Sequence, residues 1–316
     1  MGERSRAEGT FVSRARRCTG TAARLLAALL FLPAGAAGDE PLEQTFEVKP
    51  DVRVDIEILS GSIEVRAIDA DEVRLRSEGG GGLEIDGSRR RVSIRAPATG
   101  WFPWSRGVDV ELQIEVPRES RLTIRSINGR IRVEGVEGEL HLHAANGEID
   151  VEGTPREAYL ETMTGAIRFE GERSTVVART INGEVRLQGV AGEVEVSTVS
   201  GAIRVEGEDL ERADLRTMSG EIELRASLAP RARVEARSYS GAVRLGLPAD
   251  TSARFEVQSF SGGVHSEFAS RLEGEDRKGS RDRGRGRPLS FVVGDGDARV
   301  TIESFSGGVR IEEQGG

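Results

Sequence analysis

A short phrase that returns every 18 residues constrains this chain more than any other feature. It first appears in full as Ser-Ile-Asn-Gly at Ser126–Gly129. Regular copies have their glycines at Gly129, Gly147, Gly165, Gly183 and Gly201, looser copies follow at Gly220, Gly241, Gly262 and Gly307, and a lone copy lies at Gly61. A fixed period of this length is typical of a repeat architecture, in which each unit buries its apolar residues against its neighbours.

Within each unit, apolar and charged residues alternate after the repeat glycine. Ile131 and Val133 follow Gly129 by two and four positions, and Arg132 stands between them. A second apolar pair, Leu140 and Leu142 in this unit, completes the pattern. Alternation with a period of two predicts half-buried strands. Each unit is therefore predicted to contain two short strands and two turns.

Two all-β architectures fit this pattern. Pairs such as Asn128-Gly129 suit turns that need a positive φ, and they also occur in antiparallel hairpins. Because the same residue types recur in the same column at a constant step, we expect a β-solenoid or β-roll-like stack of two-strand coils, about 4.8 Å apart, with 18 to 21 residues per coil. A β-sandwich of hairpins is the alternative.

The residue two positions before each repeat glycine is apolar along the whole series. In chain order the column contains Ile127, Ala145, Met163, Ile181, Val199, Met218, Tyr239, Phe260 and Phe305. It grows from aliphatic to aromatic, so we interpret it as part of the core, closed at the far end by larger side chains. On this interpretation the column has no role in ligand binding.

Composition and local pattern divide the chain into five parts. Residues 1–38 have the pattern of a signal peptide, with Arg16 and Arg17 before an apolar run and small residues after it. Residues 39–117 are predicted to form an N-terminal β cap region and 118–268 the β-repeat body. Residues 269–297 are a charged Gly/Arg-rich insertion that we expect to be disordered, and 298–316 a closing β coil and tail.

The charge of the chain bears on its partners and its location. The formal net charge is −9 at pH 7, and residues 1–38 hold six arginines but only two glutamates, so the remainder is more acidic still. An acidic surface argues against nucleic acid, whose binding needs a cationic face. The apolar run in residues 1–38 is too short to span a bilayer. We expect export to the periplasm or cell surface, with no transmembrane span in the mature chain.

No catalytic, cofactor or metal site is predicted. The charged residues are spread along every unit, and none of the familiar nucleophile, phosphate-binding or zinc-protease motifs is present. His141 and His143 are predicted to face solvent beside Tyr159 and Glu161 of the next coil, a set that could bind zinc but is more typical of an ordinary surface. Gly294–Asp297 is a lone fragment of a calcium-binding repeat.

One aromatic stretch is the only candidate for a partner contact. It contains Trp101, Phe102 and Trp104, and both tryptophans of the chain lie in it. An exposed loop of this kind could contact a glycan, a membrane or a protein. The alternative, which we favour, is that it folds over the end of the core.

The repeats resemble a bacterial family of exported β-strand-repeat proteins. The resemblance is carried by Ser126–Gly135, by its successors, and by the ending Asp297–Val309, and it covers residues 45–312. This family is known as a proposed adhesin domain or a domain of unknown function. The resemblance implies surface adhesion and supplies no catalytic residues or cofactor.

The sequence therefore favours an exported, non-enzymatic β-repeat protein. We expect an adhesin-like, binding or structural role in the cell envelope, with a protein or glycan there or on another surface as its partner. One alternative is a periplasmic scaffold or accessory of an envelope-stress or regulatory system. Another is an enzyme that acts on envelope polysaccharide, which would require carboxylates that converge in one cleft.

Overall fold

A computed structural model describes residues 42–78, 83–96, 110–268, 271–272 and 289–314. Within these ranges every regular element is a β-strand, and none is a helix that could cross a membrane. Residues 1–38, Trp101, Phe102, Trp104 and most of the insertion lie outside the described residues, so the predictions made for them stay predictions.

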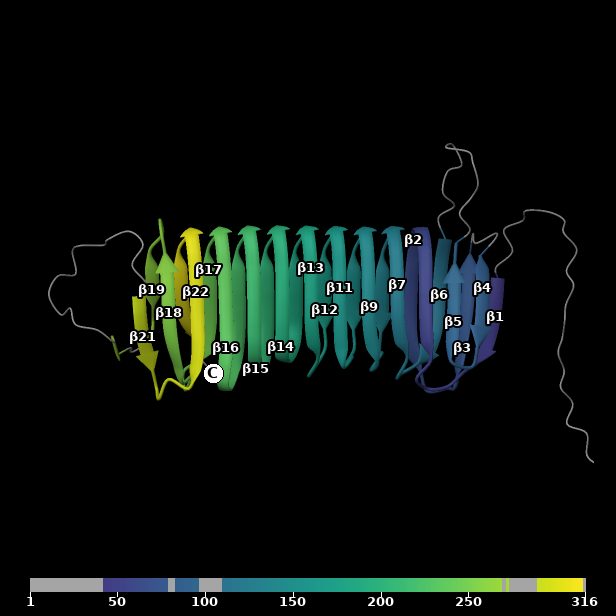
Figure 1. The fold of residues 1–316 in the computed structure, drawn as a ribbon, viewed down its shortest axis with the longest axis horizontal. Helices are drawn as coiled ribbons and strands as arrows, with labels where there is room; N and C mark the ends of the chain where they lie inside the picture. The colour runs from purple at the N-terminus through teal and green to yellow at the C-terminus, as the bar shows by residue number, and fades with distance from the viewer. Residues whose placement is uncertain (1–41, 79–82, 97–109, 269–270, 273–288, 315–316) are drawn as a thin grey trace, which may run out of the picture. The chain divides into compact units, whose positions relative to one another are not determined.

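The repeat body is a stack of coils whose strands pair in parallel with those of the coils above and below (Figure 1). Its strands are β7 (Arg121–Asn128), β8 (Ile131–Glu134), β9 (Glu139–Asn146), β10 (Ile149–Glu152), β11 (Glu157–Thr164), β12 (Ile167–Glu170), β13 (Thr175–Asn182), β14 (Val185–Ser200), β15 (Ile203–Ser219) and β16 (Ile222–Ser240). The all-β stack is thus confirmed, and the sandwich of antiparallel hairpins is not formed.

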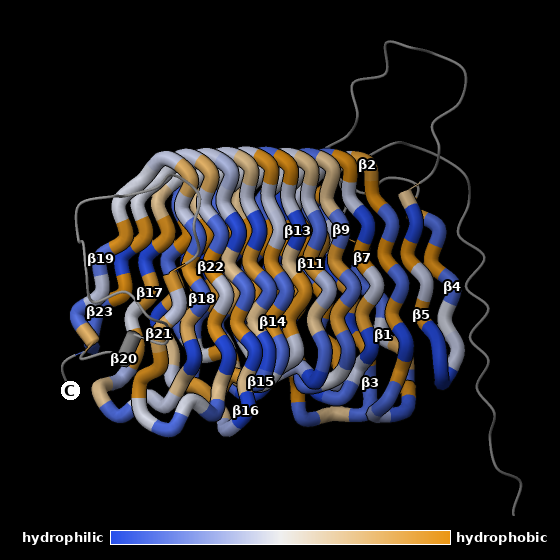
Figure 2. The backbone as a smooth tube through the Cα atoms, turned by 60° about the vertical axis from the view of Figure 1, so that its left-hand side comes forward, coloured by the Kyte–Doolittle hydropathy of each residue, from blue (hydrophilic) through white to orange (hydrophobic). Residues whose placement is uncertain are grey.

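The pairing register reproduces the sequence period. Ile149 pairs with Ile131 on one side and with Ile167 on the other, so equivalent residues lie directly above one another. The columns of Ile131, Val133, Leu140 and Leu142 are buried in a core that continues from coil to coil. Figure 2 shows the result as bands of apolar and polar residues that run across the coils.

The repeat glycines form one edge of the stack, which we call the glycine edge. A Cβ on Gly129 would lie 1.7 Å from the carbonyl oxygen of Gly61, and one on Gly165 would lie 1.9 Å from that of Gly147. Both glycines also have a positive φ, of 141° and 146° respectively. Glycine recurs at this edge because successive turns approach too closely for any side chain.

The N-terminal part contains both parallel and antiparallel pairs. Its strands are β1 (Leu42–Glu47), β2 (Arg53–Ile68), β3 (Glu72–Glu78), β4 (Glu84–Ser88), β5 (Arg91–Arg95) and β6 (Val110–Pro117). β2 forms a complete coil, paired in parallel with β7 and β8 on one side and with β5 and β6 on the other. Beyond these, β3 and β4 pair antiparallel with β6 and β5, and β1 pairs antiparallel with β3.

The C-terminal part departs from the expected order. Its strands are β17 (Val243–Pro248), β18 (Ala253–Ser259), β19 (Val264–Ser266), β20 (Arg271–Leu272), β21 (Leu289–Val293), β22 (Ala298–Ser306) and β23 (Val309–Gln314). β22 lies between β16 and β18, and β23 lies between β17 and β19. The prediction that residues 298–316 close the stack is therefore wrong, because this coil is inserted one place inside the end.

Part of the insertion is ordered. Residues 289–293 form β21, which pairs antiparallel with β18 and so covers its outer side. Phe291 of β21 is buried, and its ring stacks on Phe255 of β18 with centroids 4.7 Å apart. The prediction of disorder is thus wrong for these residues, because their apolar side chains extend the core.

Candidate functional site

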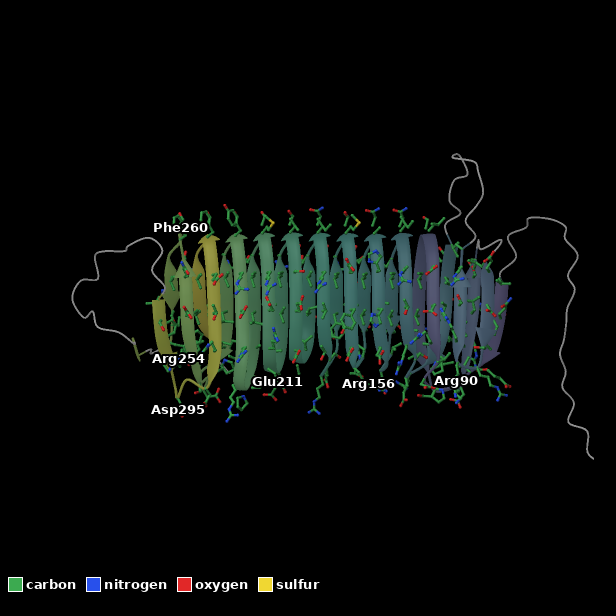
Figure 3. All side chains as sticks on the ribbon, viewed as in Figure 1. Arg90, Arg156, Glu211, Arg254, Phe260 and Asp295 are labelled. Carbon is green, nitrogen blue, oxygen red and sulfur yellow. The ribbon has the colours of Figure 1, made fainter. Side chains whose placement is uncertain are left out.

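The column predicted to lie in the core is instead exposed along the glycine edge. In spatial order it consists of Leu59, Ile127, Ala145, Met163, Ile181, Val199, Met218, Tyr239, Phe305 and Phe260, and we call it the apolar ladder. Apart from Ala145, each of these side chains is between 42 and 59% exposed. Figure 3 shows a row of side chains along one edge of the stack, with Phe260 labelled near its end.

Strand alternation explains this correction. In β11, Ala158, Leu160 and Thr162 point into the core, so the next residue, Met163, must point outward. The residue one place before the ladder residue points inward instead, and in most coils it is a small hydroxyl residue, as seen for the buried Thr162, Thr180 and Thr198. Apolar character had suggested burial, but the period-two pattern of the strand decides the direction.

The aromatic end of the ladder consists of stacked rings. The ring of Phe305 lies between those of Tyr239 and Phe260, with centroid distances of 4.8 and 4.9 Å and interplanar angles of 3° and 4°. The ring faces are therefore turned toward one another along the stack, and the ring edges point outward. Sugar recognition by stacking needs a free ring face, so these rings suit contact with another apolar surface better than contact with a glycan.

A groove runs beside this end of the ladder. It has a volume of about 500 Å³, and its lining includes Met218, Tyr239, Phe305 and Phe260 on one side and Arg216, Arg237, Glu303 and Gln258 on the other. Arg237 donates a hydrogen bond to Glu303 at 3.0 Å, and Arg216 pairs with Asp214. The groove thus joins an apolar wall to a wall of paired charges.

The face made by the strands after the repeat glycine carries ion pairs. Arg132 contacts Glu134 at 2.7 Å and Glu152 of the next coil at 3.1 Å, and Arg66 contacts Glu134 from the coil before. Burial raises the pKa of Glu134, but hydrogen bonds from Arg66 and Arg132 outweigh it and hold the pKa below its usual value. These carboxylates neutralise arginines across the coils.

The histidines predicted to face solvent do lie at the surface, beside Tyr159 and Glu161. His141 stacks on Tyr159 with centroids 4.8 Å apart, and His143 lies 3.5 Å from a carboxylate oxygen of Glu161. Within the described part of the chain, no group of three or more histidine, cysteine, aspartate or glutamate side chains gathers to hold a metal ion. His141 and His143 are thus engaged with a ring and a carboxylate of the next coil.

The fragment Gly294–Asp297 forms a turn around Ser252. The backbone N–H groups of Asp295 and Gly296 each donate to the Ser252 hydroxyl oxygen at 3.0 Å, and that of Asp297 donates at 3.4 Å. Gly294 and Gly296 have the positive φ angles that such a turn requires. This turn accounts for the two glycines.

A parallel β-stack of similar coils with one apolar edge defines a β-repeat protein. The chain belongs to the toastrack family DUF4097, which matches residues 45–312. The resemblance inferred from the repeats is thereby confirmed. None of the curated proteins with which the chain was compared matches it.

The chain also matches solved structures of proteins from bacteria. They include a proposed cell adhesion protein of Clostridium sporogenes, with 10% identity over 87% of this chain and 100% of that chain and a TM-score of 0.24. A proposed adhesin of Bacteroides fragilis has 13% identity over 87% and 98%, with a TM-score of 0.35. A proposed lipid-binding protein of Parabacteroides distasonis has 10% identity over 87% and 97%, with a TM-score of 0.30.

Proposed function

We propose that the protein is a non-enzymatic, adhesin-like binding protein of the cell envelope and that the apolar ladder is its binding surface. The observation that carries this proposal is the ladder itself, in which nine large apolar side chains stand exposed in one line. Single exposed apolar residues are ordinary, but a continuous strip of roughly several hundred Å² marks a contact site.

The charged side chains support a binding role over a catalytic one. Enzymes that act on polysaccharides use two carboxylates that converge on the substrate, one of them with a raised pKa. Here Glu134 and Glu184 are held by arginines, which lower their pKa although burial raises it. Burial raises the pKa of Asp150, but Arg130 and Arg168 contact this carboxylate on the outer face of the stack.

Location outside the cytoplasm is part of the proposal. It is supported by the basic, apolar and small-residue pattern of residues 1–38. A C-terminal tag, tested with antibody and protease on intact cells, decides the location. Accessibility on intact cells is the expected result for an adhesin, and protection until the outer membrane is opened would assign the binding role to a scaffold in the periplasm.

The role of the ladder is tested by substitution at its aromatic end. The variant Met218→Ser, Tyr239→Ser, Phe305→Ser, Phe260→Ser removes apolar area from exposed positions only, so its thermal unfolding midpoint should stay close to that of the wild type. We expect this variant to leave the envelope fraction for the soluble fraction. A control with Arg156→Ser and Glu211→Ser on the opposite edge (Figure 3) should remain attached.

If the folded ladder variant stayed attached as firmly as the control, the ladder would not be the binding surface.

A further inference from the structure

The side chains of the ladder are complementary to the same ladder read in the opposite direction. We propose that its partner is a second copy of this chain, and that two copies pack edge to edge with their ladders antiparallel, related by a two-fold axis between Ile181 and Val199. The inference rests on the proposed function, because it names what the ladder binds, namely a copy of this chain that is already held in the cell envelope. Three independent rows of side chains support it.

The first row is the ladder, whose smallest residue meets one of its largest. Reversal of the ten positions brings Leu59 opposite Phe260, Ile127 opposite Phe305, Ala145 opposite Tyr239, Met163 opposite Met218, and Ile181 opposite Val199. Ala145, the smallest side chain, meets Tyr239, which is 58% exposed. The combined size of each pair varies less than the size of single residues, as close packing at an interface core requires.

The second row stands two residues before the ladder in each strand. From the β2 end it contains Glu57, Arg125, His143, Glu161, Arg179, Ser197, Arg216, Arg237, Glu303 and Gln258. The proposed axis lies in the plane of contact, perpendicular to the ladders, so this row meets its own reverse. Arg125 then faces the partner's Glu303, and Glu161 faces the partner's Arg216. No two carboxylates of this row meet.

The third row follows the repeat glycines on the other flank. It contains Ser62, Arg130, Glu148, Ala166, Glu184, Ala202, Glu221, Ala242, Gly308 and Gly263. Reversal places Glu148 opposite the partner's Ala242, Ala166 opposite the partner's Glu221, and Glu184 opposite the partner's Ala202. Every acidic residue of the row thus meets an alanine, so like charges are kept apart along this flank.

The other two-fold arrangement fits less well. An axis parallel to the ladders would place each residue opposite its own copy, so that Tyr239 would meet the partner's Tyr239 while Ala145 met the partner's Ala145 across a gap. It would form two Arg–Glu contacts, as the antiparallel arrangement does, but it would also bring Arg125 against the partner's Arg130. The antiparallel arrangement avoids both the uneven fit and the repulsion.

Disulfide trapping tests this arrangement directly. In a Cys18→Ser background, the double variant Ala145→Cys, Tyr239→Cys should form a covalent dimer on mild oxidation. Within one chain these positions are five coils, or about 24 Å, apart, so they cannot form an internal disulfide. Neither single variant should be trapped, because each cysteine would then lie about 24 Å from its counterpart. A trapped Ala145→Cys single variant would overturn the antiparallel arrangement.

Sedimentation velocity on protein purified after expression of the whole chain tests the dimer itself. At about 50 µM we expect a dimer, and the variant Ile181→Glu, Val199→Glu should raise the dissociation constant at least about 100-fold. The control Arg156→Glu makes the same change in charge on the opposite edge and should leave the dimer intact. A wild-type protein that sediments as a monomer at this concentration would overturn the proposal.

Failure of this inference differs from failure of the proposed function. If the wild type is a monomer but the serine variant still leaves the envelope, the ladder binds another partner and the second copy is excluded. If the wild type is a dimer but the serine variant stays attached, the dimer stands and the ladder has no role in envelope attachment.

Discussion

The Thr162 hydroxyl donates a hydrogen bond to the carbonyl oxygen of Gly147 in the neighbouring coil, 3.1 Å away. Equivalent bonds repeat along the glycine edge, from Thr180 to Gly165, Thr198 to Gly183, Thr217 to Gly201, Ser238 to Gly220 and Ser304 to Gly241. A buried row of hydroxyl groups thus donates hydrogen bonds to the carbonyl oxygens of the tight turns, and these bonds link each coil to the next.

Removal of one hydroxyl tests this link. Thr162→Val keeps the shape of the side chain but leaves the Gly147 carbonyl without its donor, so we expect a loss of about 1–3 kcal/mol in the free energy of unfolding. Thr162→Ser keeps the hydroxyl and should lose less. Chemical denaturation measures both. Equal losses for the two variants would mean that the methyl group, and not the hydrogen bond, stabilises the turn.

The close approach of the turns is tested at a glycine. Gly165→Ala should cost at least about 3 kcal/mol, because it adds a clash with the Gly147 carbonyl oxygen to an unfavourable φ. Gly192 also has a positive φ, but a Cβ there would meet no atom within 4 Å. Gly192→Ala should therefore cost only about 1 kcal/mol. The thermal unfolding midpoints of the two variants separate the effect of the clash from that of the backbone strain. Similar midpoints would show that the clash adds no cost.

Two isoleucines of opposite orientation test the exposure of the ladder. Ile167 is fully buried, so Ile167→Ala should cost about 2–5 kcal/mol through lost burial and the cavity left behind. Ile181 is 42% exposed, and Ile181→Ala should cost less than about 1 kcal/mol in the stability of a single chain. Denaturation at a low protein concentration, where dimers do not contribute, gives the comparison. If Ile181→Ala lost as much free energy of unfolding as Ile167→Ala, the ladder residues would have to be buried in the core.

The ion pairs predict an acid dependence of stability. The pKa of Glu134 lies below 4.5 in the folded protein, because the hydrogen bonds from Arg66 and Arg132 outweigh the opposing effect of burial. A lowered folded-state pKa contributes stability that is present above pH 4.5 and is lost as the pH falls through the folded value.

Glu134→Gln should therefore flatten the pH dependence of the thermal midpoint in this acidic range. The effect should stay below about 1 kcal/mol, because the pairs are partly solvated. Wild-type and variant curves that remain parallel between neutral pH and pH 3 would show that Glu134 does not supply this dependence.

Much of the fold could be predicted because it follows from one repeated unit. Ile131 and Val133 show the period of two, and the constant step of 18 residues shows that equivalent residues stack. The direction of the ladder was mispredicted because residue size was weighed above strand alternation. The row of Thr162 and Thr180 could have shown the correct direction. Hydroxyl residues that recur with the same period indicate buried groups that donate hydrogen bonds to the carbonyl oxygens of the turns.

The order of the last coils could not be predicted from local patterns. Residues 253–262 and 298–307 are near-copies, so local pattern gives no reason for one of them and not the other to lie beside β16 and β17. The pairing of β21 with the outer side of β18 distinguishes them, and that pairing depends on Phe255 and Phe291, which are far apart in the sequence. The reversed match along the ladder is also invisible until strand order places Phe305 before Phe260.

The inserted coil sets a condition on how the protein is made. A chain that emerges N-terminus first can add coils in sequence as far as β17, since each new coil rests on a finished one. β18 and β19 are synthesised next, but the place beside β16 and β17 belongs to β22 and β23, which come last. Because the two segments are near-copies, both could pair with β16 and β17. Correct assembly requires that β18 and β19 do not occupy this position before β22 and β23 arrive. The last strands to be synthesised, β22 and β23, are thus inserted between strands that were made before them.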